Sequence, residues 1–475
     1  MRNLTLLTDL YQLTMMNGYV ESGKADDIAV FDVFYRQMPN LDFAVVAGLE
    51  QAIDYIENLH FDDSDIAYLR SLNLFGEKFF DRIKDFHFTG DIYAMKEGEI
   101  AFPTEPILTV KAPLFEAQLI ETALLNILNH QTLIATKSFK INQETAGDPV
   151  SEFGLRRAQG PDAGLYGARA SIIGGCTSTS DVLAGKMFGL KIAGTHSHSW
   201  VMSFPSEIEA FEKYAELYPD ACLLLVDTYD TLGSGVPNAI KVFDKLKANG
   251  HKPLGIRLDS GDLAYLSKKA RVMLDNAGHT EARIFVSNDI DEHIVSTLKM
   301  QGAKINSWGI GTKLITAAPQ PALGGVYKLA GIMKDGVLVP KIKVSDTQEK
   351  TTNPGFKTTY RIYSKSTGIA LADLISLRSE HFDESGPLTI FHPTETWKKQ
   401  TLTDYRMRDL TVKIYDNGKL VYDRPTLPEI VEFAKKCKQE FYPEYFRLIN
   451  PHIFKVDLSA ELHKLKSELL TASRK

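Results

Sequence analysis

The stretch PLGIRLDSGDLAYLSKKARVMLDNAGHTEARIFVSND (253–289) contains an apolar run, an amphipathic helical segment and a second apolar run. The helical segment begins after Asp262, repeats apolar residues at helical spacing and ends before Gly278, where glycine is favoured after a helix. The flanking runs are apolar without alternation, as in strands that are buried on both faces of a parallel sheet. The stretch therefore predicts a β-strand, an α-helix and a second, parallel strand.

The same βα unit recurs on both sides of this stretch. Further apolar runs occur at PVSEFG (149–154), KIAGTH (191–196), CLLLVD (222–227) and INSWGIGT (305–312), with a weaker one near GGCTSTSD (174–181). Capping boxes between the runs are formed by Ser206 with Glu209 and by Asp289 with Glu292. About six or seven such units in succession predict a closed or nearly closed βα barrel over residues 141–324 rather than an open doubly wound sheet.

The two flanks have a different pattern. Residues 1–140 mix helical stretches with alternating runs, which indicates an α+β part. Residues 325–475 contain short strands, a hairpin at TVKIYDNGKLVYD (411–423) with its DNG turn, and a final amphipathic helix. We expect the two flanks to form a single discontinuous α+β domain, with the irregular βα barrel between them.

Composition excludes several classes of protein. The chain has 475 residues, 44% hydrophobic and 24% charged, with a net charge of −6 and no long basic run, which argues against nucleic-acid binding. The apolar run ACLLLV (221–226) is far shorter than the roughly 20 residues that span a bilayer. The first residues lack the features of a signal peptide, so we expect a cytoplasmic protein without membrane association. Three widely spaced cysteines favour neither a zinc site nor a disulfide framework.

The polar clusters that follow the predicted strands should meet at one face, because the loops at the carboxyl ends of barrel strands lie together. These clusters are RR, TSTSD, THSHS, DTYDT, RLDSGD, SNDID and GIGT, and they combine charge, hydroxyl groups and glycine. Such a concentration at one face is typical of an active site.

Two histidines, His196 and His198, lie two residues apart in GTHSHSW (194–200), so in a strand their side chains would share a face. A metal pair would need further histidine ligands at later strand ends, and the one nearby candidate, His293, falls inside a predicted helix. A single nucleophilic or acid–base imidazole and a pair of hydrogen-bonded structural histidines are the other two interpretations.

Two turns are candidates for anion binding. Arg257 ends a strand before Gly261 and a helix N-terminus, an arrangement suited to a carboxylate or a phosphate. The alternative is an ion network of Arg257 with Asp259 or Asp262. GIGT (309–312) allows close approach of backbone N–H groups to an anion, with the Thr312 hydroxyl as a further donor, although a plain tight turn has the same sequence.

Three further features remain open on the sequence alone. Aspartates recur at the predicted strand ends, where they suit Mg²⁺ beside phosphates or simply cap helices. The loop KVSDTQEKTTNPGFK (343–357) fits a solvated connection better than a lid. Cys176 lies near the barrel mouth without an activating partner, and we expect a small packed residue rather than a nucleophile.

Six motifs in order resemble the nicotinate phosphoribosyltransferase family. They are LLTDLYQLTM (6–15), EFGLRRAQGPD (152–162), GTHSHS (194–199), RLDSGDL (257–263), SNDID (287–291) and GIGT (309–312). The resemblance implies a type II phosphoribosyltransferase fold and usually a homodimer. It also implies the joining of nicotinate to 5-phosphoribosyl 1-diphosphate, giving nicotinate mononucleotide and pyrophosphate. This ligase-type reaction is coupled to ATP hydrolysis in NAD salvage and uses Mg²⁺.

The resemblance also implies roles for individual residues. His198 matches the phosphorylated histidine, and this chain has His196 where relatives often carry an apolar residue. The resemblance places nicotinate contacts at Tyr11, Thr195 and Arg257, a phosphoribosyl diphosphate contact at Thr312 and an active-site arginine at Arg156. Ser260, Gly261 and Gly311, in the two anion-binding turns, are also expected to bind substrate. Tyr11 is expected to reach the site from the neighbouring subunit. No firm metal site is predicted, and Asp259 or Asp289 among the strand-end aspartates is the candidate ligand for Mg²⁺.

Other functions are compatible with the same scaffold. A nicotinamide phosphoribosyltransferase would not need Arg257 to meet a carboxylate, and a quinolinate phosphoribosyltransferase would need more cations. A metal hydrolase would use both histidines, and a non-catalytic protein would bind nucleotide without releasing pyrophosphate.

Overall fold

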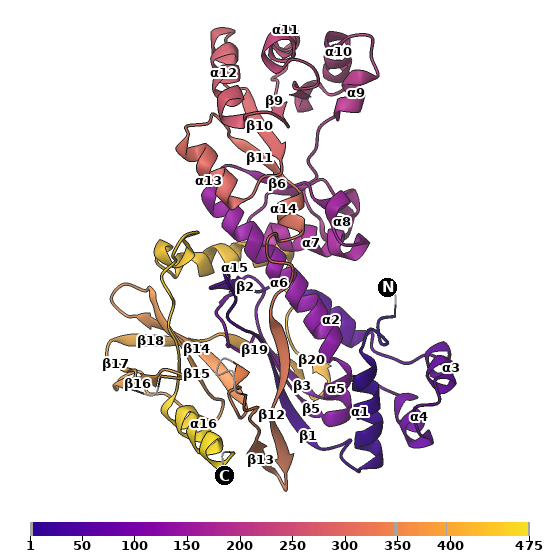
Figure 1. Ribbon diagram of the computed structural model, residues 1–475, viewed down its shortest axis with the longest axis vertical. Coiled ribbons are helices and arrows are strands. Elements are labelled where there is room, and N and C mark those ends of the chain that lie inside the picture. The colour runs from indigo at the N-terminus through magenta and orange to yellow at the C-terminus, as the bar shows by residue number, and fades with distance from the viewer. Residues whose placement is uncertain (1–2, 346–349, 396, 474–475) are drawn as a thin grey trace. The chain divides into compact units, whose positions relative to one another are not determined.

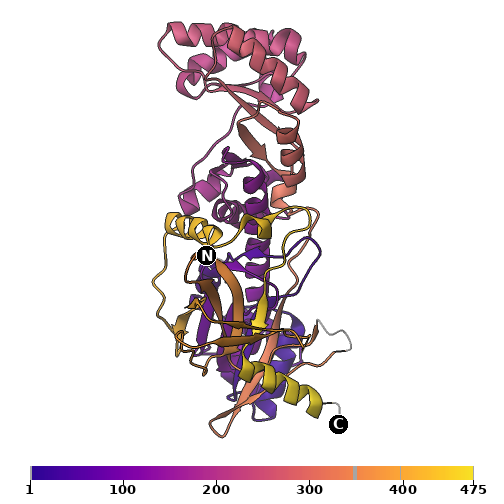
Figure 2. The same cartoon turned by 90° about the vertical axis from the view of Figure 1, so that its left-hand side faces the viewer.

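The computed structural model describes residues 3–345, 350–395 and 397–473 (Figures 1 and 2). The chain forms two compact units: unit 1 contains residues 1–133 and 322–475, and unit 2 contains residues 134–321. The two ends of the chain therefore fold together, which confirms the expected discontinuous α+β domain.

Unit 2 is built on a six-stranded parallel sheet, which confirms the predicted succession of βα units. The strands, in their order across the sheet, are β7 (Ser178–Thr179), β6 (Val150–Glu152), β11 (Ser307–Ile310), β10 (Arg283–Asn288), β9 (Gly255–Leu258) and β8 (Leu223–Leu225). The α-helices are the end of α6 (Glu121–Glu144), α7 (Pro161–Ile173), α8 (Val182–Phe188), α9 (His198–Met202), α10 (Glu207–Leu217), α11 (Val236–Ala248), α12 (Leu263–Asn276), α13 (Glu292–Met300) and α14 (Thr312–Ile315). Helices α10, α11 and α12 lie side by side in both ribbon views.

Side-chain caps fix where several of these helices begin. Ser206 caps α10 and Asp262 caps α12, both as the sequence predicts. The predicted cap at Asp289 is wrong: Asp291 caps α13 and accepts the Ile294 N–H. A tight turn after β10 delays the helix by two residues and leaves Asp289 at the cavity described below.

The sheet is irregular at KIAGTH (191–196), where the sequence predicts a strand. Ile192 forms an isolated parallel bridge with Thr179, and no named strand includes residues 191–196. The prediction that His196 and His198 share one strand face is therefore wrong, because His198 is the first residue of α9 and His196 lies in the preceding loop. Strands β7 and β8 are the two edges of this sheet, so its named strands do not close into a complete ring.

Unit 1 contains two larger sheets and a short third one. The first has the order β13 (Val337–Pro340), β12 (Gly325–Lys334), β1 (Ile28–Tyr35), β5 (Leu108–Pro113), β3 (Asp91–Met95), β19 (Thr411–Asp416) and β20 (Lys419–Leu420). The second has the order β17 (Lys399–Leu402), β16 (Leu388–Phe391), β21 (Val456–Leu458), β15 (Ala370–Leu377), β14 (Lys357–Ser364) and β18 (Tyr405–Asp409), and β2 (Ala44–Val45) pairs with β4 (Ile100–Ala101). The first sheet combines both ends of the chain, because the N-terminal strands β1, β5 and β3 lie between the C-terminal strands β12 and β19.

Unit 1 also contains eight α-helices or parts of helices within the described residues. They are α1 (Leu10–Glu21), α2 (Leu49–Glu57), α3 (Asp63–Ser71), α4 (Glu77–Ile83), α5 (Leu114–Leu119), the first part of α6, α15 (Leu427–Gln439) and α16 (Ala460–Ala472). The predicted hairpin at 411–423 is confirmed: β19 and β20 are antiparallel, and Asn417 and Gly418 both have positive φ, as a type I′ turn requires.

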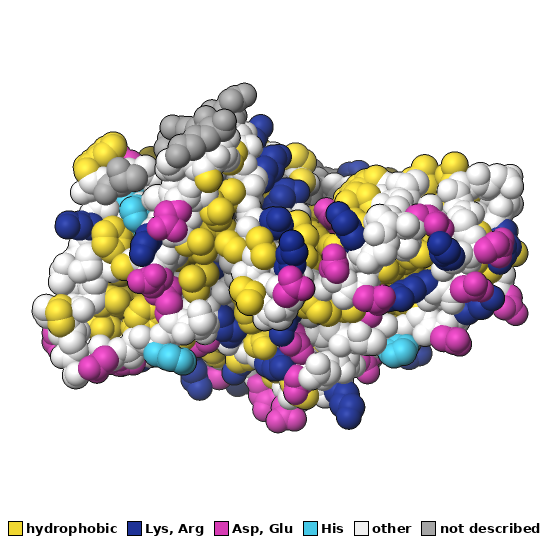
Figure 3. All heavy atoms as spheres, turned by 90° about the horizontal axis from the view of Figure 1, so that it is seen from below, with side chains coloured by type: hydrophobic (Ala, Val, Ile, Leu, Met, Phe, Trp, Pro, Cys, Tyr) yellow, Lys and Arg dark blue, Asp and Glu magenta, His cyan; other side chains and the backbone are white. Residues whose placement is uncertain are grey.

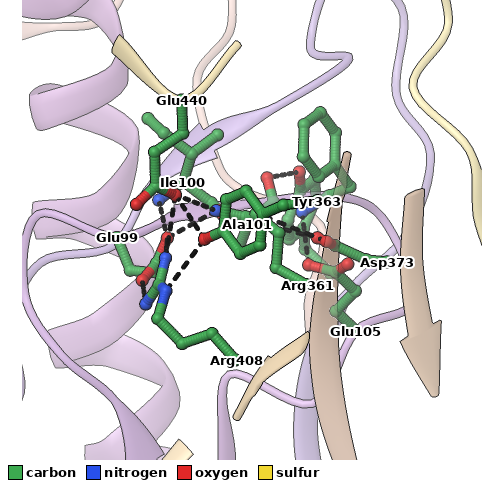
Figure 4. Close-up of polar contacts among 11 residues, drawn as sticks. Glu99, Ile100, Ala101, Glu105, Arg361, Tyr363, Asp373, Arg408 and Glu440 are labelled. Atoms are coloured by element: carbon green, nitrogen blue, oxygen red, sulfur yellow. Dashed lines mark hydrogen bonds and ion pairs between the residues drawn. The ribbon is translucent and has the colours of Figure 1, made fainter. Parts of the chain in front are cut away.

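A buried group of ion pairs joins the two segments of unit 1 (Figure 4). Arg361 of β14 is fully buried and donates to Asp373, to Glu99 and to the Ile100 carbonyl. The Arg408 guanidinium binds Glu99 from the other side at 2.7 Å. Burial raises the pKa of a carboxyl group, but the two guanidinium groups outweigh it and hold the pKa of Glu99 below its usual value.

The surface of unit 1 mixes charges of both signs. Figure 3 shows Lys and Arg side chains interspersed with Asp and Glu on the face seen from below. Among the described residues, no helix combines the length and apolar character needed to cross a membrane. Residues 346–349 of the loop 343–357 lie outside the described part of the chain; at its start, the Lys343 N–H donates to the Thr352 hydroxyl.

Candidate active site

A cavity of about 560 Å³ opens in unit 2 at the carboxyl ends of the strands. The predicted site residues in its wall are Arg156, Thr195, His198, Arg257, Asp259, Asp289, Gly311 and Thr312. Ser260 and Gly261 do not line this cavity, and Tyr11 belongs to unit 1, where it is exposed on α1. The structure thus brings most of the predicted polar groups to one space, as expected for loops at one face of a βα fold.

Strand β9 places Arg257 in the cavity wall, where three hydrogen bonds hold its side chain. Its guanidinium donates to the Thr195 hydroxyl at 2.8 Å, to the Ser287 hydroxyl at 2.7 Å and to Asp259 at 2.9 Å. These contacts use three of the five N–H groups of an arginine, so two remain beyond the contacts described. The ion pair with Asp259 therefore leaves two N–H groups of Arg257, in the cavity wall, without a partner among the contacts described.

Asp259 is ionised and fixed by the same group. Burial raises the pKa of its carboxyl group, but hydrogen bonding from Ser287 and the positive charge of Arg257 outweigh burial, so the pKa lies below its ordinary value. Both partners contact the same oxygen, Oδ1. The other oxygen takes no hydrogen bond from the described residues.

His196 is part of the framework of the fold. It is buried, and its Nε2 accepts the backbone N–H of Leu225 at 3.2 Å, at the outer edge of β8. Its ring packs edge-to-face on Tyr214 with centroids 4.7 Å apart. Burial is the main cause that lowers the pKa of His196 to about 4, so the ring is neutral near pH 7. The His196 side chain thus accepts the Leu225 N–H at the sheet edge, next to the position where the sequence predicts a further strand.

His198 has a different environment. Its side chain is 39% exposed, it lines the cavity, and its Nε2 lies 3.2 Å from Oδ1 of Asp227. Asp227 is fixed on its other oxygen, which accepts the Asp259 N–H at 2.8 Å and the Ser260 hydroxyl at 2.7 Å. Asp227 therefore orients the imidazole through Nε2 and leaves Nδ1 as the nitrogen with a free lone pair.

The GIGT turn lies at the end of β11. A Cβ atom on Gly309 would approach the rings of Phe153 and Phe285 to 2.7 Å, and one on Gly311 would approach the Phe153 carbonyl to 2.8 Å. Glycine is therefore required at both positions by close packing. Thr312 is the first residue of α14, and its side chain faces the same cavity.

Ser260 and Gly261 do not line the cavity but act on residues near it. The Ser260 hydroxyl donates to Asp227, and Gly261 has a φ of 75°, which lets the chain turn into the Asp262 cap of α12. Cys176 is buried, and burial raises the pKa of its thiol to about 12, as expected for a packed residue.

The cavity wall also includes Phe153, Arg157, Ser287 and Asn288, which belong to the quoted motifs but were not predicted individually as site residues. Phe153 and Arg157 flank the predicted Arg156, and Ser287 and Asn288 end β10 inside the quoted SNDID motif. Asn288 has a φ of 151°, a conformation that non-glycine residues adopt mainly where the surrounding structure enforces it. The sequence signal that could have identified Ser287 and Asn288 is their position at the end of a predicted strand.

The carboxylates of Asp259 and Asp289 fit an Mg²⁺ ion only in part. Both line the cavity, but among the described residues the one cluster of three metal-ligand side chains is Glu99, Cys437 and Glu440 in unit 1. In that cluster both carboxylates already bind Arg408. Mg²⁺ commonly uses one or two protein carboxylates together with substrate phosphate oxygens, so Asp259 and Asp289 supply the protein part of such a donor set and the substrate would have to supply the rest.

Comparison with known proteins places the whole chain in one family. Residues 6–129, 149–363 and 356–466 match the models for the nicotinate phosphoribosyltransferase N-terminal domain, family and C-terminal domain. The nicotinate phosphoribosyltransferase of Bacillus subtilis (strain 168) is 47% identical over 98% of this chain and 97% of its own length. The Homo sapiens nicotinate phosphoribosyltransferase is 32% identical over 98% of this chain and 96% of its own length.

Solved structures agree. The crystal structure of human nicotinic acid phosphoribosyltransferase matches with a TM-score of 0.85 at 31% identity, covering 98% of this chain and all of that chain. Nicotinate-nucleotide pyrophosphorylase from Pyrococcus furiosus shares the fold, with a TM-score of 0.71 at 21% identity over 92% of this chain and 96% of that chain. The chain belongs to the nicotinate phosphoribosyltransferase family.

Proposed function

We propose that this chain joins nicotinate to 5-phosphoribosyl 1-diphosphate, releases pyrophosphate and couples the reaction to ATP hydrolysis in cytoplasmic NAD salvage. The observation that carries the proposal is the pairing, in one cavity, of a fixed guanidinium with an oriented imidazole. Arg257 offers free N–H groups to the nicotinate carboxylate, and His198 presents Nδ1.

In the ATP-dependent half of the reaction, Nδ1 of His198 attacks the γ-phosphorus of ATP, the bond to the β-phosphate oxygen breaks, and ADP leaves. Asp227 holds the proton on Nε2, so the attacking nitrogen is the one that faces away from Asp227. Water later hydrolyses the phosphohistidine. The neutral, buried His196 is unsuited to this role because both of its nitrogens already face backbone groups.

In the glycosyl transfer, the nicotinate ring nitrogen forms a bond to the anomeric carbon while the bond to the pyrophosphate oxygen breaks. Positive charge develops on the ribose, and the leaving pyrophosphate needs neutralisation. We assign this task to Arg156, with Gly311 and Thr312 as N–H and hydroxyl donors. Mg²⁺ would be held by Asp259 or Asp289 and would neutralise phosphate charge when bound.

We further propose that the active protein is a homodimer with shared sites. Tyr11 lies on the exposed side of α1 beside exposed Leu7, Leu10 and Met15, an apolar set suited to a subunit contact. The Tyr11 ring would stack on the pyridine ring in the site of the neighbouring subunit.

The test is a pyrophosphate-release assay with 5-phosphoribosyl 1-diphosphate and Mg²⁺, with and without ATP. We expect nicotinate to support release, ATP to stimulate it, and nicotinamide and quinolinate to be poor substrates. A preference for nicotinamide or quinolinate would identify a sister enzyme, and binding without any release would identify a non-catalytic protein. Either result would contradict the proposal.

A further inference from the structure

Unit 1 contains another large cavity. None of the residues that line it has been assigned a role in the proposed function. Its volume is about 640 Å³, which falls in the range of small-molecule sites. It lies beside β16, β17 and β21 of the second sheet, and its wall includes His392, Trp397, Lys398, Lys399, Lys455 and Asp457. Every residue of this wall belongs to unit 1.

Asp457 is the unusual group of this cavity. It is 3% exposed, and its Oδ1 has no hydrogen-bond partner among the described residues. In the parallel register it lies opposite Leu374, a fully buried residue of an apolar cluster. A buried carboxyl group without a partner is costly, and a ligand that donates a hydrogen bond would relieve that cost.

An aromatic plane and cations complete the wall. Trp397 is 74% exposed, whereas a tryptophan side chain is ordinarily well buried. Lys455 donates to Gln400 and Lys398 pairs with Glu395, while Lys399 has no ion pair within the described part of the chain. The three lysines outnumber Asp457 and Glu395, so the wall favours an anionic ligand.

We propose that this cavity binds a purine nucleotide, with the base against Trp397, its amino group donating to Asp457, and its phosphate paired with Lys399 and Lys455. The three features of the wall call for one molecule that has a hydrogen-bond donor, a flat ring and a negative charge. An amino-bearing heterocycle joined to a phosphate combines all three. This site is separate from the proposed function and does not depend on it.

The test uses tryptophan fluorescence of the full-length protein, titrated with adenosine monophosphate. Trp397 is one of three tryptophans, and Trp200 and Trp308 both belong to unit 2. We expect a saturable change of emission that the Trp397→Phe variant lacks. Asp457→Asn should weaken binding roughly tenfold or more, the loss expected for a hydrogen bond to a charged group.

Controls separate this site from the other cavity and from effects on folding. Lys399→Ala alters an exposed side chain and should also weaken binding, whereas Lys464→Ala, on the exposed part of α16, should not. Arg257→Gln should leave the Trp397 signal unchanged. Adenosine and inorganic phosphate, titrated separately, should each bind much more weakly than the nucleotide. A response that persists in Trp397→Phe, or equal binding of phosphate alone, would overturn the proposal.

Discussion

At the scale of single residues, two histidines of one short motif have opposite environments. His196 is buried and neutral and binds a strand edge, whereas His198 is part-exposed and oriented by a carboxylate. The two histidines lie so close in the sequence that the motif alone does not separate their roles. Their tertiary environments do separate them.

Replacing His198 by Ala is expected to abolish ATP hydrolysis and the stimulation of transfer by ATP, because the phosphoryl acceptor is lost. Slow ATP-independent transfer should remain, since Arg257 and the rest of the cavity are unchanged. ADP release and pyrophosphate release, measured in parallel, check both expectations. His196→Gln is the matched control and should retain ATP hydrolysis; the opposite pattern would reassign the phosphorylated residue.

Replacing Arg257 by Gln is expected to raise the KM for nicotinate by roughly tenfold or more, because a charge-assisted hydrogen bond contributes about 1.5–3 kcal/mol. Nicotinamide has no negative charge, so its binding should weaken much less. Initial rates over a range of each substrate give the comparison. If acid and amide lost equally, Arg257 would instead bind phosphate.

At the scale of elements, the loop before α9 takes the place of an expected strand. The His196 side chain accepts the Leu225 N–H that a neighbouring strand would otherwise bind. The stability of this contact between the loop and β8 therefore depends on the protonation state of His196, whereas a backbone hydrogen bond would not depend on it.

This dependence predicts an acid-sensitive unit 2. The pKa of His196 is lowered to about 4 in the folded protein, from an ordinary value of 6.5. The unfolded chain then binds more protons between these values, so stability is full above about pH 6.5 and falls as the pH drops towards 4. The loss is at most about 1.4 kcal/mol for each pH unit in this window.

Urea unfolding, followed by tryptophan fluorescence, measures this effect at a series of pH values, in a Trp397→Phe background whose remaining tryptophans, Trp200 and Trp308, both belong to unit 2. His196→Gln keeps an acceptor for Leu225 without a titrating ring, so its stability should fall less steeply below pH 6.5. His60→Gln, at an exposed position, should follow the wild type. Identical slopes for wild type and His196→Gln would refute the explanation.

At the scale of the whole molecule, unit 1 is assembled from two segments separated by unit 2 in the sequence. Sheet pairing and the buried ion pairs of Arg361 and Arg408 hold the segments together (Figure 4). A carboxylate from the first segment, Glu99, thus neutralises two cations from the second.

Replacing Arg361 by Met is expected to destabilise unit 1 by about 3–5 kcal/mol, because Glu99 and Asp373 would be left buried without that cation. The matched control is Arg406→Met. Arg406 is an exposed residue of β18 whose guanidinium packs on the Tyr363 ring, and its loss should lower the stability of unit 1 by about 1 kcal/mol or less. Chemical unfolding of each variant gives the difference, and equal losses would show that the buried pairs add no stability.

If sites are shared across a homodimer, mixing Tyr11→Ala and His198→Ala protomers, each of which lacks ATP-stimulated transfer, is expected to restore that activity. One of the two sites in each mixed dimer would then have both residues, so purified mixed dimers should reach about half of the wild-type rate. Differently tagged protomers allow that purification. Inactive mixed dimers would mean that each protomer builds its own site.

The amino-acid sequence by itself determined the βα units, the discontinuous α+β domain, the hairpin and the family, because these depend on local periodicity, turn residues and ordered motifs. It did not determine the loss of a strand at residues 191–196, the cap at Asp291 or the separate roles of the two histidines. Those depend on which backbone groups other segments leave unpaired and how deeply each side chain is buried. Such properties arise only when distant parts of the chain pack together, so only the tertiary structure decided them.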